Sequence, residues 1–144
     1  MKYGKYPNAF YRVTLKAIIE DADGRILMVK EKSDFWDLPG GGWDHSENLE
    51  AAFARELTEE IGYEGAFVLT YARTVPIFAP RLDGCVLFLV YGAHLSHAYS
   101  PHAGRDATEV AFRERKQILA DTSRTGRIIA SLIGEGDMPF SDEA

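Results

Sequence analysis

The segment from Leu49 to Ile61 constrains the fold more than any other, because its apolar residues recur with the period of an α-helix. Asn48 suits the N-cap position of such a helix, and Gly62 suits the position just after its end. The apolar residues that share one face are Phe53, Ala54, Leu57 and Ile61. A helix with one apolar face needs a partner to pack against, and the strands predicted elsewhere in the chain supply a sheet for it.

Three glutamates share a neighbouring face of the same predicted helix. Glu56, Glu59 and Glu60 are spaced i, i+3 and i+4, so they fall within about a third of the helix circumference. Like charges at this spacing destabilise a helix, and carboxylates in the last turn oppose the helix dipole. A bound Mg²⁺ ion, which prefers oxygen ligands, would reverse the sign of this interaction. From the helix alone, a solvated acidic face partly relieved by Arg55 is the alternative interpretation.

The residues before the helix favour the metal interpretation. Residues 39–42 are Pro-Gly-Gly-Gly, which predicts irregular backbone, since proline lacks an N–H donor and glycine allows positive φ and close approach. The chain then reads Gly41, five residues, Glu47, seven residues, Arg55-Glu56-Leu57, one residue, Glu59-Glu60, one residue, Gly62-Tyr63. This pattern resembles the Nudix box at every charged and glycine position, and residues 36–41 resemble the family's usual lead-in. Tyr63 is the one departure, in a slot where the family more often has an aliphatic residue.

Alternating apolar residues predict strands on both sides of this motif. Strands are predicted at residues 11–19, 25–29, 66–76, 85–95 and 109–112, with a short one that includes Trp36 and Leu38, and a second helix at residues 123–133. The first two strands read as a hairpin around a turn at Asp23-Gly24. The resemblance implies the Nudix fold, an α/β/α sandwich with a mixed β-sheet between helices. We expect a single domain over residues 1–144, with a frayed acidic tail over about residues 135–144.

The resemblance also implies roles for the residues of the motif. It gives metal-ligand roles to Glu56, Glu59 and Glu60, with the backbone carbonyl of Gly41 as a further oxygen ligand. Mg²⁺ is the expected cofactor, with Mn²⁺ as a substitute. The reaction implied is attack of a metal-activated water on phosphorus, with a glutamate taking the proton. Glu56 and Glu59 are both candidates for this base, and the sequence leaves open the choice between them and the number of metal ions.

Other charged residues have supporting roles in this interpretation. Arg55 completes the catalytic set, and we expect it to form an ion pair with Glu47 that fixes the loop relative to the helix. Glu109 is a candidate for an additional metal ligand, with an exposed glutamate at a strand end as the alternative, and Asp106 is a weaker candidate.

Substrate contacts are less well marked than the metal site. Candidate contacts to substrate phosphate or sugar are Arg12, Arg73 and Arg81, whereas Trp36 is expected to be structural. The histidines at positions 94, 97 and 102 fit a solvated strand end better than a zinc site, because no cysteine accompanies them and a glutamate site suits a harder metal.

Charge and composition limit the classes of partner that this protein can bind. The net charge of −6 argues against binding of long nucleic acid, which needs a basic surface. The lone Cys85 has no partner for an internal disulfide, no apolar run is long enough to span a bilayer, and the N-terminus lacks the apolar core of a signal peptide. We therefore expect a cytoplasmic protein with no membrane partner. A homodimer stays open, because the apolar residues 85–91 suit a core or an interface, and we favour the core.

The activity implied is hydrolysis of a phosphoric anhydride in a nucleoside diphosphate linked to X, such as a nucleoside triphosphate or a nucleotide sugar. One alternative is a catalytically silent metabolite-binding module, which the intact glutamates oppose. Another is an RNA 5′-end pyrophosphohydrolase, which would need a basic track for the polymer. The family's subgroup markers do not choose the substrate, since Pro80 lies in their range but Phe78 occupies the place of the ADP-ribose-type proline.

Overall fold

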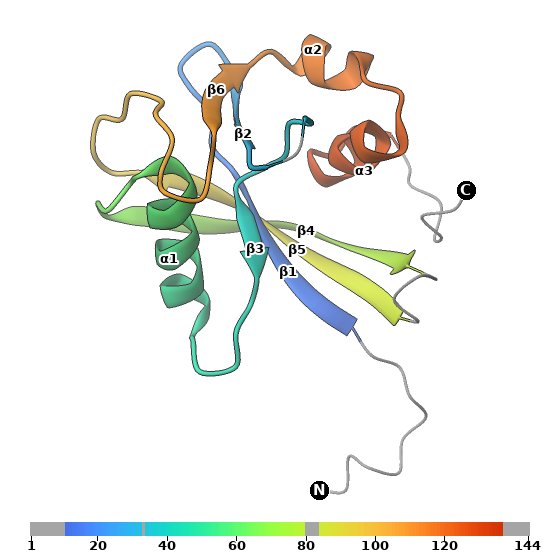
Figure 1. The fold of residues 1–144 in the computed structure, drawn as a ribbon, viewed down its shortest axis with the longest axis horizontal. Coiled ribbons are helices and arrows are strands. Elements are labelled where there is room, and N and C mark those ends of the chain that lie inside the picture. The colour runs from blue at the N-terminus through green and yellow to red at the C-terminus, as the bar shows by residue number, and fades with distance from the viewer. Residues whose placement is uncertain (1–10, 33, 80–83, 137–144) are drawn as a thin grey trace, which may run out of the picture.

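The computed structural model describes residues 11–32, 34–79 and 84–136. In chain order these residues form β1 (Tyr11–Ile18), β2 (Ile26–Lys30), β3 (Gly40–Gly42), α1 (Leu49–Ile61), β4 (Phe67–Ala79), β5 (Gly84–Leu95), β6 (Glu109–Arg113), α2 (Arg115–Ala120) and α3 (Arg124–Leu132), as Figure 1 shows. None of the helices in these ranges is both long enough and apolar enough to cross a membrane. Most of the acidic tail expected from about residue 135 lies outside the described residues.

The main sheet is mixed, as expected. Its strand order is β3-β1-β5-β4, with β1 and β5 parallel and the other two pairs antiparallel. A second, two-stranded sheet pairs β2 with β6 in antiparallel fashion.

Both faces of the main sheet are covered by helices. On one face, Leu89 and Tyr91 of β5 pack into an apolar cluster that contains Phe53 of α1. On the other face, Phe88 and Val90 pack into a cluster that contains Ile118 of α2 and Ile129 and Leu132 of α3. This alternation is the period-two pattern of a strand that is buried on both sides. Figure 1 shows α1 and α3 on opposite sides of the strands, so the α/β/α sandwich is confirmed.

The limits of α1 are those that its end signals predict. The Asn48 side chain accepts a hydrogen bond from the backbone N–H of Ala51 at 2.8 Å, which makes it the N-cap. Gly62 follows the last helical residue with a φ of 65°, the left-handed conformation that favours glycine. The predicted second helix is also present as α3, with the Ser123 side chain as its N-cap.

One prediction about strand pairing and one about backbone conformation are wrong. The expected hairpin of residues 11–19 and 25–29 is limited to one bridge between Glu20 and Ile26, because β1 already has β3 and β5 as neighbours and β2 pairs with β6 instead. Residues 40–42 are not irregular but form β3, paired with β1.

The glycines of β3 allow close contact with neighbouring residues, and Gly40 in addition adopts a positive φ. A Cβ on Gly40 would lie 1.9 Å from the backbone oxygen of Leu15, and Gly40 has a φ of 141°. The short strand expected around Trp36 and Leu38 reduces to a single bridge between Asp37 and Val29. Helix α2 was not predicted.

Candidate active site

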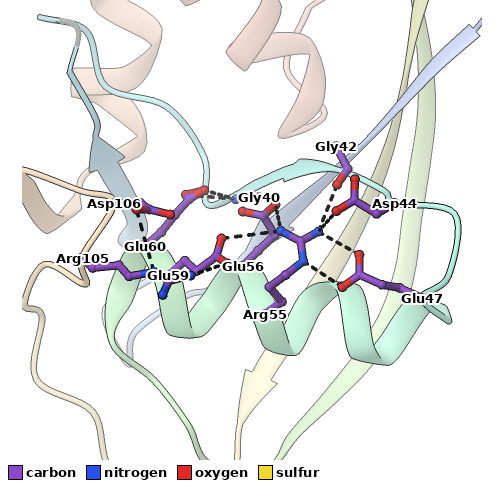
Figure 2. Close-up of polar contacts among 10 residues, drawn as sticks. All are labelled: Gly40, Gly42, Asp44, Glu47, Arg55, Glu56, Glu59, Glu60, Arg105 and Asp106. Carbon is purple, nitrogen blue, oxygen red and sulfur yellow. Dashed lines mark hydrogen bonds and ion pairs between the residues drawn. The ribbon is translucent and has the colours of Figure 1, made fainter.

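The predicted acidic face of α1 turns toward β3 and is largely buried. Glu60 is 2% exposed and Glu56 is 8% exposed, whereas the side chain of Glu59 is 18% exposed. Both carboxylate oxygens of Glu60 lie 3.2 Å from the backbone N–H of Gly40, which donates to them. Figure 2 shows the three glutamates side by side along the helix, with Glu60 directed at Gly40. The structure therefore places Glu56 and Glu60 against β3, with Glu59 beside them on the same helix.

Burial makes negative charge costly at this face. It raises the pKa of Glu60 to about 9; the positive charge of Lys16 opposes this shift and the negative charge of Glu56 adds to it. Burial likewise raises the pKa of Glu56, against the opposing effect of Arg55. Two neighbouring buried carboxyl groups that resist ionisation are stabilised in their charged form by a bound cation. The donor set consists of oxygen atoms, which fits a hard divalent cation such as Mg²⁺.

The glycines of β3 allow this approach. A Cβ on Gly41 would lie 2.5 Å from Oε1 of Glu56, so any side chain here would push the carboxylate away. A Cβ on Gly42 would lie 1.8 Å from a guanidinium nitrogen of Arg12, which places this candidate substrate contact directly against the strand. The backbone of β3 is thus in close reach of both an acidic and a basic side chain.

Arg55 connects the loop, the strand and the helix. Its guanidinium donates to both oxygens of Glu47, at 2.7 and 2.9 Å, so the expected ion pair is present in the two-bond form. It also donates to the carbonyl of Gly42 at 3.2 Å and to Oε1 of Glu56 at 2.9 Å, as Figure 2 shows. These hydrogen bonds, led by those with Glu47, raise the pKa of Arg55 and keep it charged.

A loop that the sequence connected with the site only through the weak metal-ligand candidate Asp106 holds the end of α1. We call residues 99–106 the capping loop. The backbone N–H of Gly104 donates to the carbonyl of Glu60, the N–H of Asp106 donates to that of Glu59, and the hydroxyl of Tyr99 donates to that of Ile61, each at 2.8 Å.

These contacts complete the hydrogen bonding of the last helical turn. The two preceding carbonyls, of Leu57 and Thr58, accept from Tyr63 and Gly62. The carbonyls at the end of a helix need such donors from outside the helix. That requirement was the available signal for the capping loop, but it does not say which segment supplies the donors.

Arg105 lies within the capping loop and pairs with Glu59. Its guanidinium is 2.9 Å from Oε1 of Glu59, and it also lies 3.9 Å from Asp106. The other oxygen of Glu59 is 3.5 Å from Arg55. Within residues 11–32, 34–79 and 84–136, no three His, Cys, Asp or Glu side chains are placed to hold one metal ion together. The glutamate oxygens are instead directed at arginines and at the Gly40 amide.

The remaining candidates fall outside this group. Glu109, at the start of β6, is 57% exposed and lies 3.8 Å from Lys30. Arg73 donates to the carbonyl of Leu132 at the end of α3. The centroid of the Trp36 ring lies 4.9 Å from the ammonium of Lys30 and 5.1 Å from the guanidinium of Arg113, in keeping with a structural role. Pro80 and Arg81 lie outside the described residues.

Comparison with known proteins places this site in a family. A family model described as the NUDIX domain matches residues 10–129. The chain is 46% identical over 50 residues to a putative 8-oxo-dGTP diphosphatase of Bacillus subtilis, a match that covers 34% of each protein. It is 36% identical over 67 residues to an RNA pyrophosphohydrolase of Sphingopyxis alaskensis, covering 44% of this chain and 42% of that relative. The matches thus span less than half the length of these curated relatives.

The fold has close counterparts among solved structures. A MutT protein from Methanosarcina mazei superimposes with a TM-score of 0.65 at 22% identity, covering 81% of this chain and 86% of that one. At this level of identity the likeness concerns the fold. Because the family model spans most of the sequence and includes the whole of β3, α1 and the loop between them, the protein belongs to the NUDIX domain family.

Proposed function

We propose that this chain is a divalent-metal-dependent hydrolase that cleaves the pyrophosphate linkage of a small nucleoside diphosphate linked to X. The observation that carries the proposal is the burial of Glu56 and Glu60 against the side-chain-free strand β3. A buried acidic pair beside an accessible backbone suits a cation that in turn binds phosphate. The relatives named as a diphosphatase and a pyrophosphohydrolase support this class of reaction.

The residues would divide the work as follows. Glu56, Glu59 and Glu60, with the carbonyl of Gly41, would hold Mg²⁺ or Mn²⁺, and for this the Glu59 oxygens would have to turn from Arg55 and Arg105 toward the ion. When bound, the cation supplies positive charge for the phosphates and makes a water more acidic. Glu56 or Glu59 accepts a proton from the attacking water, and Arg55, held by Glu47, keeps Glu56 in position.

A substrate panel tests the proposal. Release of phosphate or pyrophosphate is measured with Mg²⁺ and with Mn²⁺ over nucleoside triphosphates, nucleotide sugars and related diphosphates. We expect turnover of at least one member, and loss of it in the double variant Glu56→Gln, Glu60→Gln. Glu50→Gln is the matched control, since Glu50 is an exposed glutamate in the first turn of the same helix. Full activity in the double variant would refute the assignment.

A second candidate function is hydrolysis at the 5′ end of RNA. The match to an RNA pyrophosphohydrolase favours it, and the net charge of −6 opposes a long polymer substrate. A 5′-triphosphorylated RNA in the same panel decides between them, because preference for it over mononucleotides would replace the first proposal. Ligand-induced stabilisation without turnover of any substrate would instead indicate a binding module.

A further inference from the structure

Glu59 differs from the other two glutamates in what surrounds it. It is the least buried of the three, and arginine nitrogens approach both of its oxygens. One arginine, Arg55, comes from the helix itself, and the other, Arg105, comes from the capping loop (Figure 2). The carboxylate most accessible from solvent is therefore already neutralised by the protein.

The backbone on either side of Arg105 is fixed to the helix. The N–H of Gly104 donates to Glu60 and the N–H of Asp106 donates to Glu59, both at 2.8 Å. A Cβ on Gly104 would lie 2.5 Å from the backbone oxygen of Glu59, so the absence of a side chain permits this contact. The Cα of Arg105 is thus held beside the last turn of α1, whereas its long side chain can still change its rotamer.

The two arginines differ in how firmly they are held. Arg55 is 30% exposed and is bound by Glu47, Glu56 and the Gly42 carbonyl. These contacts would hold Arg55 in position even without its ion pair to Glu59. Arg105 is 75% exposed, and its only other charged neighbour among the described residues is Asp106 at 3.9 Å. An ion pair this exposed contributes little free energy, so Arg105 leaves Glu59 at small cost.

We propose that Arg105 is a positioning residue that serves as an exchangeable counter-ion for Glu59. It neutralises and orients the carboxylate in the metal-free protein and gives it up when a divalent cation binds. Arg105 therefore competes with the cation and lowers the metal affinity of the substrate-free protein. The inference rests on the proposed function, because it takes Glu59 as a metal ligand.

Binding of Mn²⁺ to the substrate-free protein, measured by calorimetry or by the spin resonance of free Mn²⁺, tests the proposal. In Arg105→Gln we expect affinity to rise about two- to fivefold, the range of an exposed ion pair. Arg25→Gln is the matched control, since it removes one positive charge from another exposed pair, with Asp21 at 2.6 Å. This control should leave the Mn²⁺ affinity unchanged.

A double-mutant cycle separates direct competition from a general charge effect. In the Glu59→Gln background, Arg105→Gln should have no further effect on Mn²⁺ affinity. An unchanged or weaker affinity in Arg105→Gln, the same gain with and without Glu59, or no Mn²⁺ binding by the wild type would each overturn the proposal. Failure of the proposed function looks different, because a protein that shows the predicted coupling but hydrolyses no substrate refutes the activity alone.

Discussion

Replacing Gly104 with alanine tests whether the capping loop holds the end of α1. The added Cβ would lie 2.5 Å from the backbone oxygen of Glu59 and 2.7 Å from that of Thr58. Neither backbone atom can swing aside as a flexible side chain would, so the loop has to move away from the helix. That movement breaks the two 2.8 Å bonds that Glu59 and Glu60 accept from Asp106 and Gly104. The φ of Gly104 is not positive, so the effect is steric rather than conformational.

The size of the effect follows from these two hydrogen bonds. Each has a net contribution of about 0.5–1.5 kcal/mol, so their loss lowers the free energy of unfolding by about 1–3 kcal/mol. For a chain of this length, that corresponds to a decrease in Tm of roughly 3–9 °C. Gly92→Ala is the control, because a Cβ at Gly92 would meet only the backbone oxygen of Thr70 at 3.7 Å, an ordinary contact. It should change stability by less than about 0.5 kcal/mol.

Urea unfolding of the metal-free protein, followed by circular dichroism, measures both variants. Tyr99→Phe is a variant of intermediate effect, since it removes the hydroxyl that donates to the carbonyl of Ile61. It should lower the free energy of unfolding by about 1 kcal/mol. If Gly104→Ala were as stable as Gly92→Ala, the capping loop would not hold the helix, and the reasoning about Arg105 would lose its structural basis.

Three further predictions concern the site itself. Gly41→Ala should displace the Glu56 carboxylate and lower kcat by about two orders of magnitude, measured at saturating substrate with unchanged circular dichroism as the folding check. Arg55→Lys keeps the charge but loses the two-bond pair with Glu47, so kcat/KM should fall about 10- to 100-fold, and an unchanged value would exclude a positioning role. Because the pKa of Glu60 is raised to about 9 from its ordinary value of 4.5, the folded metal-free protein keeps a proton that the unfolded chain loses, so stability should fall as pH rises through this window. Tm measured from pH 5 to 9 in EDTA should show this fall, Mg²⁺ should reduce it, and a flat profile in EDTA that matches Glu60→Gln would contradict it.

Local signals predicted the elements of this protein better than their partners. The limits of α1 follow from Asn48 and Gly62, which act on the helix directly through a cap and a left-handed residue. The partner of β2 does not follow from any local signal, and a turn at Asp23-Gly24 suggested the neighbouring strand. Pairing with β6 depends on β1 being occupied on both sides, which only the assembled sheet reveals.

The residues of the site show the same difference between local features, which the sequence predicts, and contacts between distant segments, which it does not. The three glutamates and the ion pair of Glu47 with Arg55 were predictable because their spacing is part of a recognisable motif. The capping loop was not, since it acts mainly through backbone N–H groups, which any residue except proline can supply. The pair between Arg105 and Glu59 joins residues 46 apart in the chain and leaves no periodic trace in the sequence.

Strand β3 has a consequence for how such a protein acquires a new substrate. It consists of three glycines, so it offers only main-chain groups to whatever lies beside it. Main-chain donors and acceptors are the same for every residue except proline, so the strand has no side chain through which a substitution could select a different nucleoside. Mutations that change substrate preference are therefore expected in the segments around β3, while the strand is retained unaltered from one specificity to the next.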